Sequence, residues 1–410
     1  MMNEVRAQKL LDDPVLRHVL TVIDAQGADT RIVGGAVRNV LMGLPANDID
    51  CATTATPQEV AELARAAGLK VVPTGIDHGT VTVVAHGRPF EITTLRRDVA
   101  TNGRRAEVAF GTDFDIDAHR RDFTMNALYL DKHGKLYDFT NGLADITARR
   151  VRFIGDAATR IREDYLRILR FFRFSADYGV GALDAAGLAA CIQERAGLAQ
   201  LSRERVRSEM LRILVARRAV EVVTDLSDIG VLTAITGGVA ELGRFTRVAS
   251  GADDAVIRLL ALSVVVPEDA ERLRERLRLS NGEFDRLNKA GSLIARMHGR
   301  RETVDVRTLR RLVVELGLQP VADATTVLAG EPTPVLNDAA HALLADFING
   351  SQRVPVFPLT GKHLAAAGVS AGPRMGRVLA RARDLWLDAD CSSNADDLNA
   401  LLAKAVIQVP

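Results

Sequence analysis

The segment RIVGGAVRNVLMGLPANDIDCATTATPQEV, from Arg31 to Val60, decides the fold of the first part of the chain. Its pattern predicts a strand over Thr30–Val33, a turn at Gly34-Gly35 and a helix over Ala36–Met42. Two glycines in such a turn let backbone amides approach a phosphate, and the helix N-terminus adds a favourable dipole. Arg38, one turn into the helix, is placed to reach the same anion. A strand–GG–helix unit is by itself more often only a tight turn.

Carboxylates in the same segment indicate a metal site. Asp48 and Asp50 fall on a second extended stretch, Asp48–Ala52, where residues two apart face the same side. The two charges repel unless a cation lies between them, and Mg²⁺ takes carboxylate and phosphate oxygens while keeping water ligands. Glu91, on a later strand, supplies a third carboxylate for two-metal phosphoryl transfer. A solvated loop for the aspartates and an exposed strand position for Glu91 are the plain alternatives.

Local signals extend an α+β pattern to about residue 145. Thr56, Pro57 and Glu59 form the start of a helix that Gly68 ends, through an N-cap, a proline in the first turn and a capping glutamate. Two further pairs of alternating segments predict hairpins around His-Gly turns, and the strands are Thr80–Val84 with Pro89–Leu95, and Ala127–Asp131 with Lys135–Phe139.

Strand signals nearly vanish beyond Asp156. Helical periodicity is present in Asp156–Asp177, Ser202–Arg218, Asp254–Val264, Pro267–Leu279 and Val304–Leu316. The sequence therefore predicts an α+β head, with a mixed sheet and helices, followed by an all-α remainder.

Two charged segments follow the carboxylates. In HRRDFTMNALYL, Arg121 and Asp122 precede an apolar strand, where the cation suits a phosphate and the carboxylate suits a ribose hydroxyl. In IREDYLRILRFFRFSADYG, Asp164, Arg167, Arg170 and Arg173 follow the polar side of a predicted helix. A charged turn and a plain amphipathic helix explain most of these two patterns.

Asp164 and Arg167 also have a specific chemical interpretation. Arginine donates to a ring nitrogen, and aspartate accepts from an exocyclic amine. Cytosine and adenine carry that amine, whereas uracil and guanine present a carbonyl that would face the carboxylate repulsively. One Asp–Arg pair therefore accepts C and A without a template strand. This follows from the hydrogen-bonding edges, because spacing alone does not single out the pair.

Composition sets broad limits. The 410 residues contain 53 Lys+Arg and 52 Asp+Glu, so net charge (+1) gives no indication of a nucleic-acid partner. The three cysteines stand far apart, which predicts neither a zinc site nor a disulfide framework. The N-terminus lacks the pattern of a signal peptide, and no apolar run reaches membrane-spanning length. We therefore expect a cytoplasmic protein with no membrane association.

Taken together, these segments resemble the class II tRNA nucleotidyltransferases (CCA-adding enzymes) and the related bacterial poly(A) polymerases of the DNA polymerase beta superfamily. The matching motifs are GGAVRN, DID, RRDFTMNA, EDYLRILRFFRF and LSRERVRSEM, in the family's order from about Arg31 to Met210. Each motif is weak alone, and the ordered set carries the resemblance. FPLTGKHLAAAGVSAGPRMGRVLARA is similar to the tail of many members.

The resemblance implies roles for individual residues. Asp48 and Asp50 would be the Mg²⁺ carboxylates, whereas the catalytic role of Glu91 rests on its strand position alone. Gly35 and Arg38 would contact the triphosphate, and Arg121 and Asp122 the phosphate and ribose. Asp164 and Arg167 would read the base, and Arg170 and Arg173 would support the incoming nucleotide. Arg205 and Glu209 fall in the family's last motif, which is usually interpreted as structural support for the neck.

The resemblance also implies an organisation and a reaction. A catalytic head over residues 1–145 would be followed by a helical neck for nucleotide recognition (146–218), an RNA-binding body (219–300) and a tRNA-binding tail (301–410). The expected activity is addition of C, C and A to the 3′ end of tRNA from CTP and ATP. The oligomeric state is not predicted.

Two features qualify the resemblance. Asn39 stands where the family's first motif commonly ends in aspartate, so a role that needs negative charge there is in doubt. Arg96–Phe114 falls where the family has a flexible loop that helps to switch from C to A addition, and its Arg97-Asp98 and Arg104-Arg105 suit such a loop. A plain exposed turn is the alternative.

Four narrower or different functions stay open at this stage. The chain could be an A-adding enzyme or a poly(A) polymerase, since these share the motifs. The sequence shows no strongly basic C-terminal extension, which disfavours the poly(A) polymerase. A CC-adding enzyme is disfavoured by the Arg96–Phe114 segment. A non-catalytic tRNA-binding protein is disfavoured by Asp48 and Asp50, because mutually repelling carboxylates would have no reason to be kept.

Overall fold

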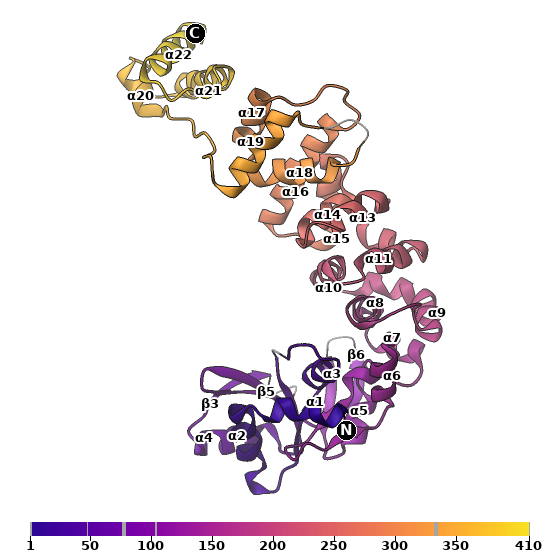
Figure 1. The fold of residues 1–410 in the computed structure, drawn as a ribbon. Coiled ribbons are helices and arrows are strands. Elements are labelled where there is room, and N and C mark those ends of the chain that lie inside the picture. The colour runs from indigo at the N-terminus through magenta and orange to yellow at the C-terminus, as the bar shows by residue number, and fades with distance from the viewer. Residues whose placement is uncertain (1, 47, 76–78, 103–104, 332–334, 410) are drawn as a thin grey trace. The chain divides into compact units, whose positions relative to one another are not determined.

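The computed structural model describes residues 2–46, 48–75, 79–102, 105–331 and 335–409. The chain divides into two compact units, Met1–Val231 and Leu232–Pro410. The predicted class is confirmed, because a mixed sheet with helices is followed by helices (Figure 1). The border between the units falls inside the predicted body, and the four-part division stays a prediction.

The N-terminal unit contains a seven-stranded sheet in the order β3-β4-β5-β2-β1-β8-β9. Neighbouring strands in it are antiparallel except β2 and β5, which are parallel. Strands β6 and β7 form a separate antiparallel pair. The strands are β1 (Thr30–Val33), β2 (Asp50–Thr53), β3 (Lys70–Gly75), β4 (Thr80–Ala85), β5 (Arg88–Thr94), β6 (Arg96–Asn102), β7 (Arg105–Phe110), β8 (Leu128–Leu130) and β9 (Leu136–Asp138).

Helices α2 and α4 pack on strands of this sheet, while α3 contacts β1 and β8. The predicted start of α4 is confirmed, since Thr56 and Glu59 form a capping box and Pro57 occupies the first turn. The helices of this unit are α1 (Met2–Leu11), α2 (Pro14–Ile23), α3 (Gly35–Leu41), α4 (Pro57–Ala66), α5 (Phe114–His119), α6 (Gly142–Ala148), α7 (Ala157–Glu163), α8 (Leu166–Tyr178), α9 (Ala185–Glu194), α10 (Arg203–Val215) and α11 (Ala219–Asp228), with 3-10 turns η1 (Asp24–Gln26), η3 (Thr124–Asn126) and η4 (Arg195–Gln200).

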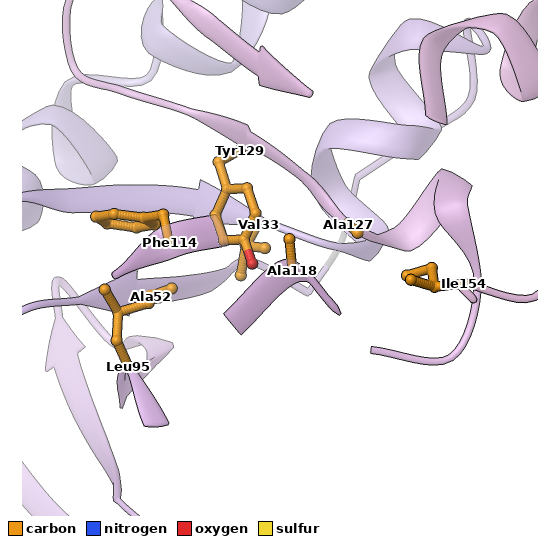
Figure 2. Packing of buried hydrophobic residues seen from close by; sticks show 8 residues of the cluster. All are labelled: Val33, Ala52, Leu95, Phe114, Ala118, Ala127, Tyr129 and Ile154. Atoms are coloured by element: carbon orange, nitrogen blue, oxygen red, sulfur yellow. The ribbon is translucent and has the colours of Figure 1, made fainter. Parts of the chain in front are cut away.

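A hydrophobic cluster joins the sheet to α5 (Figure 2). Val33 of β1 lies opposite Tyr129 of β8 in register, so both side chains share one face. The ring of Phe114 meets that of Tyr129 edge to face, with centroids 5.3 Å apart. Burying each such aromatic side chain contributes roughly 1.5–3 kcal/mol. Because Val33 also pairs with Asp50, the same packing fixes the start of β2.

The C-terminal unit is built of helices. Leu364, Val378 and Ala382 are among the buried residues of a cluster formed by its last helices. Its helices are α13 (Leu242–Ala249), α14 (Ala255–Ser263), α15 (Pro267–Leu277), α16 (Asn281–Met297), α17 (Val306–Leu316), α18 (Leu318–Leu328), α19 (Asp338–Asn349), α20 (Gly361–Ala366), α21 (Pro373–Asp388) and α22 (Ala395–Gln408), and α12 (Val231–Thr236) starts at the border between the units. Within the described ranges, no helix combines the length and the apolarity that crossing a membrane requires.

Two local predictions are wrong. Asp156–Asp177 is not one helix, because Asp164 takes an extended conformation (φ −155°, ψ 105°) between α7 and α8. The next residue, Tyr165, packs so closely on Gly197 that a Cβ there would lie 2.0 Å from its ring. The Arg96–Phe114 segment is not a bare loop or turn, since most of it forms the antiparallel pair β6–β7. Arg104 of that segment lies outside the described residues.

Candidate active site

A cavity of about 680 Å³ in the N-terminal unit brings most of the predicted site residues together. Its walls come from the β1–α3 turn, the segment before β2, the Arg120–Asn126 region, and helices α8 and α10. Of the predicted residues, those that line it are Gly35, Arg38, Asp48, Asp50, Arg121, Asp122, Asp164, Arg167 and Arg170. Glu91 and Arg173 are not among its lining residues.

The two predicted metal carboxylates flank one buried residue. Asp48 and Asp50 are exposed and Ile49 between them is buried, so both carboxylates face the cavity. Only Asp50 belongs to β2, because the strand begins two residues later than predicted. Glu91 lies beside Asp50 in the parallel β2–β5 register, on the same face of the sheet. Its position therefore fits the predicted neighbourhood, although it remains outside the cavity wall.

The carboxylates of Asp48 and Asp50 suit a divalent cation whose remaining ligands come from the phosphate oxygens of a substrate. Asp50 is accessible to solvent, but the protein groups around its carboxylate displace part of the surrounding water. This partial desolvation raises the pKa of Asp50, and the negative charges of Glu91 and Asp48 raise it further, against the lowering effect of Arg121. A cation would relieve this repulsion. Within the described ranges, no three His, Cys, Asp or Glu side chains form a complete metal cage. Two carboxylates that leave ligand positions for phosphate oxygens are typical of Mg²⁺ sites.

Arg38 is a buried cation whose direct partners are neutral. Its guanidinium donates to the side-chain oxygens of Asn39, Asn126 and Tyr178, at 2.5–3.1 Å. In the described part of the chain, no carboxylate forms an ion pair with it. Burial lowers its pKa, and its charge stays uncompensated at close range. A buried arginine without a carboxylate partner, beside the N-terminus of α3, is suited to binding a phosphate.

Asn39 uses both functions of its carboxamide. Its oxygen accepts from Arg38 Nε and Nη2 at 3.1 and 2.8 Å, while its nitrogen donates to the Pro45 carbonyl at 2.9 Å. An aspartate would lose the second bond and would neutralise Arg38 directly. The departure from the family pattern therefore leaves a structural role intact and keeps the charge of Arg38 available.

Arg121 is held by a carboxylate that the sequence did not single out. Asp117, which is 1% exposed, accepts from Arg121 Nη2 at 2.9 Å, from Arg120 Nε at 2.8 Å and from the Tyr129 hydroxyl at 2.7 Å. One buried carboxylate thus positions two arginines of the cavity wall. Burial raises the pKa of Asp117, but the two guanidiniums and the hydroxyl lower it by more, so it lies below its ordinary range.

We expect Asp117→Asn to destabilise the N-terminal unit in a pH-dependent way. Removing one partner of a buried ion pair costs about 3–5 kcal/mol at pH 7. Because the folded-state pKa is depressed, this contribution is present above the unfolded-state pKa, about 3.9, and is lost as pH falls through the folded-state value. The difference in unfolding free energy between wild type and variant should therefore shrink from pH 7 towards pH 3.

Denaturant titrations followed by intrinsic fluorescence measure this difference. All four tyrosines belong to the N-terminal unit, and the single tryptophan, Trp386, belongs to the C-terminal unit. Tyrosine emission should report the destabilisation and Trp386 emission should not. A difference that stays constant with pH would contradict the ionised role of Asp117.

The remaining predicted arginines bind carboxylates of the same unit. Arg170 donates through Nε and Nη2 to Asp122 Oδ2, at 2.9 and 2.6 Å. Burial raises the pKa of Asp122, but Arg170 and further hydrogen bonds lower it overall. Arg173 donates to Glu209 at 2.5 Å and is largely buried outside the cavity. The contacts of these residues with a nucleotide stay predictions.

Asp164 and Arg167 lie at the same wall but do not pair with each other. Asp164 accepts from Arg205 Nη2 at 2.6 Å and from the Leu166 amide at 3.2 Å. Arg167 donates through Nη1 to Glu163 and to the Arg160 carbonyl. The expectation that both lie on one helix is wrong, since Asp164 precedes α8. The helix break turns the carboxylate towards α10.

Several cavity residues were missed because distant contacts place them. Asn126 and Tyr178 bind Arg38 across 88 and 140 residues of sequence. Asn126 belongs to a motif that carries the family resemblance and Tyr178 follows another, but an amide and a phenol have no charge pattern that would mark them as site residues. Arg205 was assigned to structural support, whereas it lines the cavity.

The comparisons with known proteins agree with this geometry. Residues 30–152 match the family described as the poly A polymerase head domain. A sheet that presents paired carboxylates and arginines to one cavity, together with this match, defines a nucleotidyltransferase. Enzymes of this class depend on a divalent metal ion.

Relatives over the whole length narrow the assignment. The mitochondrial CCA tRNA nucleotidyltransferase 1 of Mus musculus is 33% identical over 406 residues, covering 95% of this chain and 90% of that protein. The CCA-adding enzyme of Limosilactobacillus fermentum is 31% identical, covering 88% and 90%. The CCA-adding enzyme of Bacillus stearothermophilus in complex with CTP superposes with a TM-score of 0.76 at 26% identity, covering 95% and 96%. The chain belongs to the CCA tRNA nucleotidyltransferase family.

Proposed function

We propose that this protein adds C, C and A to the 3′ end of tRNA, from CTP and ATP, with Mg²⁺ and without a nucleic-acid template. The observation that carries the proposal is the content of one cavity. Paired carboxylates, a phosphate-binding arginine and the Asp164/Arg167 set all face it. Relatives named for CCA addition, and solved CCA-adding enzymes with CTP, ATP or tRNA bound, support the same reaction.

In the proposed reaction, the 3′-hydroxyl of the RNA attacks the α-phosphorus of the nucleotide and pyrophosphate leaves. Asp48 and Asp50 would hold Mg²⁺, which when bound supplies charge stabilisation and a more nucleophilic hydroxyl. Arg38 and the N-terminus of α3 bind the triphosphate, since this cation has neutral partners in the protein. Arg121 contributes positive charge near Asp50 and Gly34.

We further propose the division of labour along the chain. Residues 1–145 would be the catalytic head, 146–218 the nucleotide-recognising neck, and 219–300 and 301–410 the body and tail that bind tRNA. Helices α7, α8 and α10, which carry Asp164, Arg167 and Arg205, support the neck assignment. A cytoplasmic location remains part of the proposal, while vertebrate relatives carry the word mitochondrial in their names.

The narrower alternatives share this cavity. An A-adding enzyme or a poly(A) polymerase would use the same carboxylates and arginines. The presence of the β6–β7 pair where the family has its switching loop favours an enzyme that handles both nucleotides. A non-catalytic tRNA-binding protein is disfavoured by the neighbouring carboxylates of Asp48 and Asp50 at one cavity, because binding RNA alone does not require them.

A primer-extension assay tests the proposal. Three RNAs are offered with CTP, ATP or both, and with Mg²⁺ or chelator: tRNA without its CCA end, tRNA ending in CC, and oligo(A). We expect three additions and no more to the first RNA when both nucleotides are present. One A on the CC-ended RNA alone would mark an A-adding enzyme, and long tails on oligo(A) would mark a poly(A) polymerase. Incorporation on none of them would favour the binding protein.

A further inference from the structure

Arg205 is a cavity residue whose guanidinium binds the carboxylate predicted to read the base. It lies on the first turn of α10, 41 residues after Asp164, and its Nη2 donates to Asp164 Oδ2 at 2.6 Å. Both side chains are about one fifth exposed, at 21% and 20%. The pair therefore lies at the boundary between the cavity and the protein, where an ion pair is partly shielded from water.

The helix break explains why such a partner is needed. Asp164 is extended between α7 and α8, so its side chain does not lie on the regular face of either helix. Two contacts orient its carboxylate, one from Arg205 and one from the Leu166 amide. Each carboxylate oxygen keeps a free lone pair. An exocyclic amine in the cavity can thus still be accepted while Arg205 stays in place.

Arg167 is held in the same manner by different groups. Its Nη1 is engaged by Glu163 and the Arg160 carbonyl. For its Nε and Nη2, no acceptor is found in the part of the chain that the structure describes. The two reading groups are therefore bound by separate partners, and each keeps a free edge towards the cavity.

Without Arg205, Asp164 would lose that restraint. Arg167 lies three residues further along, lines the same cavity and has Nε and Nη2 donors that no described group engages, so it would be available as a new partner. If Asp164 and Arg167 paired with each other, neither would be available to the base. The carboxylate of Asp164 would accept the hydrogen bonds that Arg167 otherwise donates to the ring nitrogen of the base. Selection among bases would weaken even though every reading group is still present.

We propose that Arg205 is a positioning residue for base selection, which holds Asp164 as an oriented acceptor apart from Arg167. This inference rests on the proposed function. It goes beyond support of the neck, because it assigns to Arg205 an effect on which nucleotide is added. If Arg205 only supported the structure of the neck, its loss would change the rates with all four nucleotides equally.

The test is the ratio of kcat/KM for CTP over UTP on tRNA without its CCA end. We expect Arg205→Ala to lower this ratio about tenfold, the effect of losing one charge-assisted hydrogen bond. Arg205→Lys restores the charge and should recover most of the ratio. Arg203→Ala is the matched control, since Arg203 is exposed on the same helix and does not line the cavity. Its ratio should stay at the wild-type value.

A double-mutant cycle separates positioning from direct contact. If Arg205 acts through Asp164, adding Arg205→Ala to Asp164→Ala should leave the ratio unchanged. An independent fall in the double variant, or a wild-type ratio in Arg205→Ala, would overturn the inference. Arg205→Gln provides a second uncharged variant should the alanine variant unfold. Failure of the wild-type protein to incorporate CTP would instead refute the proposed function.

Discussion

Asp50→Asn should lower the rate of nucleotide incorporation by about three orders of magnitude or more. The carboxylates of Asp48 and Asp50 flank a buried residue and face one cavity, which supports their assignment as the metal ligands. Losing a metal ligand removes several kcal/mol of transition-state stabilisation, and each 1.36 kcal/mol is worth a factor of ten. Single-turnover incorporation of CTP on tRNA without its CCA end measures the effect, with Asp48→Asn expected to behave alike.

The same variant should keep its fold. Partial desolvation and the neighbouring carboxylates raise the pKa of Asp50, so its ionised form is less favourable in the folded protein without a cation. A neutral amide removes that repulsion, and the melting temperature should stay equal or rise slightly. Asp115→Asn is the matched control, because Asp115 is exposed on α5 and does not line the cavity. Activity of Asp50→Asn within tenfold of wild type would refute the metal assignment.

Glu91→Gln extends this experiment to the third carboxylate. Glu91 lies beside Asp50 on the sheet but does not line the cavity, so we expect a smaller fall than for Asp50→Asn. A loss of equal size would make Glu91 a catalytic carboxylate. No loss would make it an ordinary exposed strand residue.

Local chemistry explains which parts of the fold were predictable. The start of α4 is set by Thr56, Pro57 and Glu59, which act within four residues of one another. The β4–β5 turn is set by His86 and Gly87, whose φ angles of 49° and 77° suit a two-residue hairpin turn. Interactions between residues that are only a few positions apart can be recognised from the sequence pattern.

Distant contacts explain what was missed. Helical periodicity continues through Asp164, yet the helix breaks there, and the following Tyr165 packs on Gly197 more than thirty residues later. Within the site, the charged motifs located most of the cavity residues. The partners that orient them, such as Asp117 and Arg205, come from other elements, and no rule of spacing connects them.

Arg167→Ala should relax selection against UTP and GTP. Cytosine and adenine present a ring-nitrogen acceptor beside their exocyclic amine, whereas uracil and guanine present an N–H beside a carbonyl. The Nε and Nη2 donors of Arg167, which no group in the described ranges engages, match the first arrangement and oppose the second. Their loss should lower the preference for CTP over UTP by about 10- to 100-fold, since a good bidentate contact is worth about 1–3 kcal/mol of discrimination.

This result separates reading from catalysis. Competition between CTP and UTP, and between ATP and GTP, in one extension reaction gives the ratios directly. Arg162→Ala is the matched control, because Arg162 is exposed on α7, pairs with Glu194 and does not line the cavity. A uniform fall in all four rates would leave Arg167 a structural residue. A fall in the two ratios, in a variant whose metal site is intact, is expected only if protein side chains take the place of a template.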